Sequence, residues 1–557
     1  MKRFFSCLLA VCLLLSGWLN VAASARMVTG VQELWQSVQG TTMTEWFQQG
    51  AVAALEESGY DSDVYAFSRM VYERPDMEAL RRSYETVQVA ARLADERTIM
   101  KAVYDFYDEF DWFYTRYSLA DIHYSMDLTD RYWADEYSFC VENSTEVDRL
   151  LEQVYYDLAA SPRREALEGP RYFGRGFFDA YDGENTWDET YVSLLEQEAS
   201  LTNRYYTLSE GALSYTGSNY YDACADDMAQ LLVDLIRVRQ QLAEHAGYED
   251  YRSYAYDVDF YRDYTPEQME AYLTGIREEL VDLYRRMHDT DAWGYAGRYC
   301  NEDTTFRVVR EAARAMGGTV WESFQHMEKG GLYDLTYGEN KYAASFEVYL
   351  TSYGEPFLFQ NSELTNYDQL TFAHEFGHFA NDYVCDGCYA GIDVLEFFSQ
   401  GMEYLTLCYG TDMEELTRVK LADSLATYVE QAAYASFENR MYQLTGEDLN
   451  IQALYDLYDQ VALEYGFESV GYDPREFVDV THFYTNPMYI VSYIVSNDAA
   501  MQLYEMEQRS TGTGLALFEE NLFTQEDWFL AFVEQAGLQD PFTRLDQVRD
   551  TFAEEFA

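Results

Sequence analysis

The stretch TFAHEFGHFA, residues 371–380, has two histidines, His374 and His378, on either side of Glu375. In an α-helix this four-residue spacing puts both imidazoles on one face, where they can bind the same metal ion. The chain has only 7 histidines among 557 residues, so composition alone makes this spacing rare. We therefore interpret the stretch as a metal-binding helix. The alternative is a buried helix whose histidines only hydrogen-bond to their neighbours.

An H-E-x-x-H helix is typical of zinc peptidases, in which a catalytic Zn²⁺ has three protein ligands and one water. A third ligand is therefore expected downstream of His378. The next helical pattern, residues 393–404, has Glu396, Gln400 and Glu403 on one face. Either Glu396 or Glu403 would complete a His-His-Glu site for one Zn²⁺ per chain.

Just before the metal motif, the spacing of apolar residues changes from a helical to a strand-like pattern. Residues 342–350 (YAASFEVYL) and 356–361 (PFLFQN) are short, aromatic and β-branched, which predicts a hairpin or two strands of a small sheet. An exposed edge of this sheet would hold an extended peptide through backbone hydrogen bonds. The alternative is that the strands only cover the core.

The rest of the chain is predicted to be mainly helical, because proline is rare (8 residues) and apolar residues recur at helical spacing. The clearest helix start is Thr265-Pro266-Glu267-Gln268, which combines an N-cap, a proline and a capping-box partner. That helix should end near residue 287. Further helices are expected over residues 32–57, 77–110, 191–213 and 221–246.

The chain resembles the thimet oligopeptidase and oligoendopeptidase F group in three segments around the motif. These are residues 331–334 (GLYD), 374–378 (HEFGH) and 396–403 (EFFSQGME). In that group the third ligand opens a pattern E-x-x-S-x-x-x-E. The resemblance therefore implies Glu396 as the ligand and Glu403 as a residue behind the ligands. Only 17 residues separate His378 from Glu396, fewer than the family usually has. Glu403 fits the usual spacing better and stays the alternative ligand.

A second match lies near the C-terminus, in residues 481–493 (THFYTNPMYIVSY), and a weaker one over residues 235–251. The family has a histidine followed by several tyrosines at this place. The resemblance implies that His482 and either Tyr489 or Tyr493 line the active site and stabilise the developing oxyanion. Tyr484 stays an alternative.

The resemblance implies a mainly α, multi-helical zincin-type oligopeptidase fold, with a small β-sheet beside the active-site helix and a deep substrate channel. The activity to expect is that of a zinc metalloendopeptidase, which hydrolyses bonds inside short oligopeptides with metal-activated water and Glu375 as general base. Two alternatives remain: a dipeptidase or carboxypeptidase on a related helical zinc fold, and a catalytically idle peptide-binding protein of the cell envelope.

The chain is expected to begin with a signal peptide, residues 1–25. Lys2 and Arg3 precede a short apolar run, and an A-x-A site ends the segment. The protein should therefore be exported, either secreted or retained in the cell envelope, without stable membrane insertion after cleavage. Turn-rich patches at residues 181–185 and 293–297 are candidate boundaries. We expect an N-terminal helical region, residues 26–300, and a catalytic region, residues 301–557.

The formal net charge is −60, which makes nucleic acid and anionic lipid surfaces poor partners. The acidic residues are spread along the chain, as expected for a well-solvated surface. The resemblance implies short peptides as the partners, and we expect a monomer. Six cysteines would remain after cleavage, and our hypothesis is a local disulfide between Cys385 and Cys388.

Overall fold

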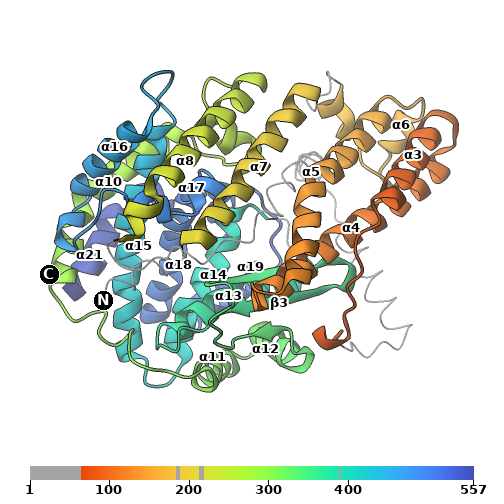
Figure 1. Ribbon diagram of the computed structural model, residues 1–557. Helices are drawn as coiled ribbons and strands as arrows, with labels where there is room; N and C mark the ends of the chain where they lie inside the picture. Colours follow the sequence, from red (N-terminus) through yellow and green to blue (C-terminus); the bar gives the residue numbers. More distant parts are fainter. Residues whose placement is uncertain (1–63, 183–187, 213–218, 388–389, 557) are drawn as a thin grey trace.

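The computed structural model describes residues 64–182, 188–212, 219–387 and 390–556. Helices make up most of this part of the chain, and a single small sheet lies among them (Figure 1). The predicted mainly α fold with a small sheet is thereby confirmed. The expected signal peptide and the helix over residues 32–57 lie outside the described residues.

The first group of helices has a hydrophobic core of its own, built from residues between Met77 and Tyr181. These helices lie together at one end of the molecule in Figure 1. The long α4 reaches from this group to the sheet, where Thr115 Oγ1 accepts a hydrogen bond from the backbone N–H of Ser352 (2.9 Å). The helices are α3 (Met77–Leu93), α4 (Glu96–Met126), α5 (Arg131–Ala159) and α6 (Arg164–Leu167).

The expectation of one helix over residues 77–110 is wrong, because the chain breaks between α3 and α4. Ala94 is extended, and the side chain of Asp95 accepts a hydrogen bond from the backbone N–H of Thr98 (2.9 Å). This N-cap starts a new helix although the apolar spacing continues across the break. The other helix predictions over described residues are confirmed by α7 (Glu189–Ala212), α8 (Asn219–His245) and α10 (Pro266–His288), and α10 begins with the predicted capping box at Thr265.

The sheet has three strands in the order β1-β3-β2, so β1 and β2 form its edges. The predicted pair is confirmed as an antiparallel hairpin, in which Ser345 pairs with Gln360 and Leu350 with Glu355. β1 runs parallel to β3, and α13 packs against both β2 and β3. The strands are β1 (Tyr333–Asp334), β2 (Ser345–Leu350) and β3 (Glu355–Gln360).

The main hydrophobic core contains residues from both sides of residue 300, from α8 and α10 as well as from the C-terminal helices. Nothing in the fold tests the expected boundary at this residue, which stays a prediction. The remaining helices are α9 (Tyr251–Tyr254), α11 (Glu302–Met316), α12 (Gly318–Gly330), α13 (Asp368–Cys385), α14 (Ile392–Tyr409), α15 (Glu414–Met441), α16 (Ile451–Glu464), α17 (His482–Thr485), α18 (Val491–Arg509), α19 (Thr513–Asn521), α20 (Phe529–Gln535) and α21 (Leu545–Phe556).

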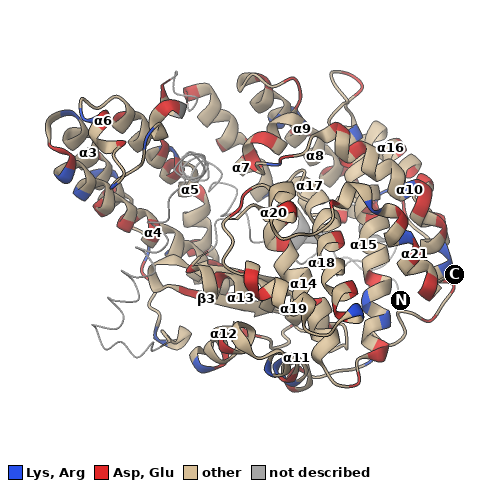
Figure 2. Cartoon of the chain, turned by 180° about the vertical axis from the view of Figure 1, so that it is seen from behind, with Lys and Arg blue, Asp and Glu red and all other residues tan. Residues whose placement is uncertain are grey.

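The acidic side chains are distributed over most of the helices rather than gathered in one block (Figure 2). Among the described helices, none combines the length and the apolar character that a membrane span requires. Cys140, Cys224, Cys300 and Cys408 are free thiols, whereas Cys385 is disulfide-bonded. Cys388 lies outside the described residues, so its pairing with Cys385 stays a hypothesis.

Candidate metal centre and active site

Two adjacent helices, α13 and α14, carry the candidate ligands. A glycine at position 377 lets them approach closely, because a Cβ there would lie 2.4 Å from the backbone oxygen of Phe398. Apolar side chains on both helices, among them Phe376 and Phe397, are fully buried around this contact. Packing therefore holds the two helices at a fixed distance and rotation.

The structure brings His374, His378 and Glu396 together. One ligand atom from each residue lies within 4.8 Å of the others, and the trio is the only such group of three or more found among the described residues. Glu396 Oε2 lies 3.5 Å from His374 Nε2, and Glu396 Oε1 lies 4.0 Å from His378 Nε2. Glu403, the alternative ligand, lies outside this group.

Glu403 instead contacts the other side of the first histidine. Its Oε1 lies 2.9 Å from His374 Nδ1. This hydrogen bond orients the ring of His374 so that Nε2 faces Glu396, the position from which it would bind a metal. The arrangement is that of a carboxylate behind a metal-binding histidine.

Glu396 is also held from two sides. The hydroxyl of Tyr489 donates a hydrogen bond to Glu396 Oε1 (2.6 Å), and Ser399 donates to Oε2 (3.0 Å). Both contacts orient the carboxylate toward the histidines. Tyr489 therefore supports the candidate ligand directly, a role that the sequence did not suggest.

Glu375 lies next to the trio and is 1% exposed. Its Oε1 has no hydrogen-bond partner in the described part of the chain. Burial raises the pKa of this carboxyl to about 8. A cation at the neighbouring ligands would lower that pKa again, because an opposite charge favours the carboxylate.

His482 and Tyr493 lie side by side, with the Tyr493 hydroxyl 3.3 Å from His482 Nε2. Burial lowers the pKa of His482 to about 4, so the imidazole is neutral at pH 7. The tautomer of His482 decides which of the two groups donates in this contact, so the imidazole and the phenol orient each other. Tyr484, the third tyrosine considered, stacks on Tyr205 (4.2 Å) and donates to the backbone of Met228. Tyr484 therefore packs in the core.

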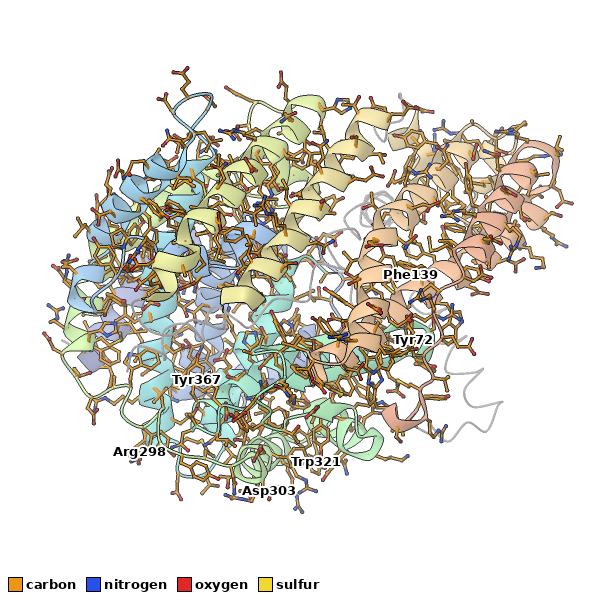
Figure 3. The ribbon with its side chains drawn as sticks, viewed as in Figure 1. Tyr72, Phe139, Arg298, Asp303, Trp321 and Tyr367 are labelled. Atoms are coloured by element: carbon orange, nitrogen blue, oxygen red, sulfur yellow. The ribbon has the colours of Figure 1, made fainter. Side chains whose placement is uncertain are left out.

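A buried chain of charged groups continues behind Glu403. Lys420 Nζ lies 2.8 Å from Glu403 Oε2 and 3.1 Å from Asp423 Oδ2. Tyr367, labelled in Figure 3 and located just before α13, donates to Asp423 Oδ1 (2.8 Å). Sequence reasoning missed this network. The available signal was a lysine and an aspartate three residues apart in a helix with few exposed positions.

A second anchor holds the segment that carries the tyrosines. The side chain of Arg262 is buried. It donates to the carbonyl oxygen of Met488 (2.9 Å) and to Ser492 (2.8 Å), and lies 3.4 Å from Asp393 in the first turn of α14. The backbone N–H of Met488 donates to Glu438 (2.8 Å). Met488 has φ of 68°, a left-handed conformation that these contacts enforce.

The residues fit a zinc ion. Two imidazole nitrogens and one carboxylate are the donor set of many catalytic zinc sites. The Nε2 atom of His374 is buried and has no hydrogen-bond partner among the described residues, as expected for an atom that binds a metal. Such a site also needs hydrogen bonds that orient its ligands. Glu403 makes one with His374, and Tyr489 makes one with Glu396.

The fold and this site resemble those of one class, the helical metallopeptidases with an H-E-x-x-H helix. Within that class, residues 67–186 match the family model described as the peptidase M3 N-terminal domain. This match and the solved structures of similar fold confirm the resemblance to the M3 and oligoendopeptidase F peptidases. No curated protein sequence matches the chain significantly.

Solved structures share the fold along almost their whole length. A protein described as an oligoendopeptidase F superimposes with a TM-score of 0.75 at 19% identity, covering 88% of this chain and 98% of that chain. The PZ peptidase A has a TM-score of 0.75 at 18% identity, with 88% and 99% covered. A Bacillus anthracis protein described as an oligoendopeptidase F has a TM-score of 0.73 at 18% identity, with 88% and 98% covered.

Proposed function

We propose that the protein is a zinc-dependent metalloendopeptidase that hydrolyses bonds inside short oligopeptides. The observation that carries this proposal is the grouping of His374, His378 and Glu396 within 4.8 Å, with Glu375 beside them, whose buried Oε1 has no partner among the described residues. The match to the peptidase M3 N-terminal domain supports the same class of activity.

His374, His378 and Glu396 would hold one Zn²⁺, which supplies a Lewis acid that activates water and polarises the scissile carbonyl. Glu375 accepts the proton of the attacking water and delivers it to the leaving amine. Tyr489 keeps Glu396 oriented. The hydroxyl of Tyr489 is bonded to Glu396, so Tyr493 is the better-placed donor to the oxyanion. A neutral His482 orients the hydroxyl of Tyr493.

β2 is an edge strand beside α13, although five of its six residues are buried. Pairing of an extended peptide with this edge, with the scissile bond facing the ligands, is part of the proposal. The basic and apolar pattern at residues 1–25 supports export of the chain to the cell exterior or envelope. Short peptide substrates and a monomeric state complete the proposal.

The test is cleavage of an internally quenched peptide blocked at both ends, with zinc content measured on the same preparations. The wild-type protein and the exposed-surface control Glu322→Gln should cleave the peptide and hold about one zinc. Glu375→Gln should keep the zinc and lose roughly 10²-fold or more of the rate.

Each other result has a defined meaning. Cleavage of only free-ended peptides would replace the endopeptidase by an exopeptidase. Zinc without any turnover in wild-type protein would favour a peptide-binding role. Folded protein that binds no zinc would refute the proposed metal site.

A further inference from the structure

A small cavity of about 60 Å³ opens beside the candidate metal centre. His374 and Tyr493 form one side of it, so a group in the cavity lies next to the reacting bond. The opposite wall comes from α15. The cavity is therefore a place for a substrate side chain, an inference that rests on the proposed function.

The α15 wall is a polar stripe on a helix that is otherwise buried. Lys420, Asp423, Thr427 and Gln431 follow one another at intervals of three and four residues, which puts them on one face. All four line the cavity. Lys420 bonds both Asp423 and Glu403, so these charges are largely satisfied within the wall.

Thr427 and Gln431 differ from the first two, because neither side chain has a hydrogen-bond partner among the described residues. Their residues are 7% and 4% exposed. Neither side chain has a polar atom that is both fully buried and unpartnered, so the hydroxyl and the amide are open to the cavity, where a ligand can hydrogen-bond to them. The amide supplies both donors and an acceptor.

Gln400 adds a third such group from α14. Its amide nitrogen donates to Ser496 Oγ (3.2 Å) and to the carbonyl oxygen of Tyr493 (3.3 Å). Its Oε1 atom is buried and unpartnered in the described part of the chain, and the residue is 4% exposed. A ligand in the cavity that brings a hydrogen-bond donor to this oxygen would satisfy it.

The charges nearby select against ionised side chains. Lys420 already pairs with both Glu403 and Asp423, so an ionised side chain would lose its hydration here without finding a free partner of opposite charge. The volume corresponds to about four water-sized groups, taking roughly 15 Å³ for each. A neutral group of this size that both donates and accepts is a carboxamide.

We propose that this cavity is a specificity subsite that binds an asparagine or glutamine side chain of the peptide, directly beside the scissile bond. The amide nitrogen of that side chain donates to Gln400 Oε1, and its oxygen accepts from Thr427 or Gln431. A leucine of similar size leaves all three groups unsatisfied, which lowers its cleavage by about tenfold or more.

The test uses blocked peptide libraries in which one position holds asparagine, glutamine, aspartate, lysine or leucine, with cleavage sites read by mass spectrometry. Wild-type protein should cleave next to asparagine or glutamine with kcat/KM about tenfold or more above leucine. Cleavage with no preference for a carboxamide at either flanking position would overturn the subsite and leave the peptidase proposal standing. No cleavage of any peptide would instead count against the proposed function itself.

Two variants locate the preference in the cavity. Gln431→Leu and Thr427→Val should each lower the asparagine-to-leucine ratio of kcat/KM about tenfold, whereas Thr417→Val on the same helix outside the cavity should keep the ratio. Gln431→Glu should shift the preference toward lysine. Zinc content and thermal unfolding on every variant separate lost selectivity from lost folding. An unchanged ratio in well-folded, zinc-bound Gln431→Leu would overturn the proposal.

Discussion

Replacing Lys420 by methionine should weaken the metal centre without touching any ligand. Lys420 lies 2.8 Å from Glu403 and 3.1 Å from Asp423, and the three side chains are 3%, 7% and 5% exposed. The variant leaves two carboxylates in the core without their shared cation. Removing one partner of a buried ion pair typically costs about 3 to 5 kcal/mol.

Part of this loss should appear in metal binding, because Glu403 orients His374 through Nδ1. Disrupting such an outer contact typically lowers metal affinity 10- to 100-fold, or about 1.4 to 2.7 kcal/mol. We expect Lys420→Met to lower the urea midpoint and to lose zinc to a competing chelator at a correspondingly lower chelator concentration.

Two further variants make this experiment decisive. Lys101→Met breaks an exposed pair with Asp105, whose side chains are 74% and 55% exposed, and should change stability by less than about 1 kcal/mol. Adding Glu403→Gln to Lys420→Met removes one uncompensated charge and should restore part of the stability. Wild-type zinc affinity in folded Lys420→Met would refute the positioning of His374 through this network.

Two other predictions concern packing and pH. Gly377→Ala should destabilise the protein by about 1 to 3 kcal/mol and impair zinc binding, because its Cβ meets the backbone oxygen of Phe398 at 2.4 Å. The control Gly401→Ala should cost less stability, because its Cβ meets only the side chains of Leu503 and Phe518. Equal urea midpoints for the two variants would contradict this reasoning. Burial raises the pKa of Glu438 to about 8 and that of Asp498 to about 7. Both folded pKa values exceed the unfolded values near 4, so this stabilisation is complete at low pH and is lost as the pH rises from about 4 to 8. The free energy of unfolding should fall from pH 5 to pH 8, and Glu438→Gln should flatten the fall; a rise over this interval would contradict the assignment.

The sequence predicted those features that depend on neighbouring residues. The capping box at Thr265 and the hairpin before α13 are local patterns, and both are present in the fold. The break at Asp95 was also local, but its single cap competed with an apolar spacing that continued across it. An aspartate cap outweighs periodicity here because it satisfies free backbone N–H groups at a helix start.

Long-range partners could not be read from the sequence. Lys420 meets Glu403 only because α14 and α15 fold against each other, and nothing in the linear pattern pairs these residues. The contact of Tyr489 with Glu396 depends on the left-handed turn at Met488, a conformation that methionine rarely adopts. The roles of the ligands, the base and the tyrosines stay predictions until metal binding and turnover are measured.

The close contact of α13 and α14 at Gly377 separates folding from metal binding, two events that many small metalloproteins combine. In a zinc finger the ion drives folding, so chelation unfolds the chain. Here buried aromatic packing sets the distance between the helices before any cation arrives. The ion would then behave as an exchangeable part of a finished scaffold, and cobalt or manganese could be loaded in its place to report on the centre spectroscopically.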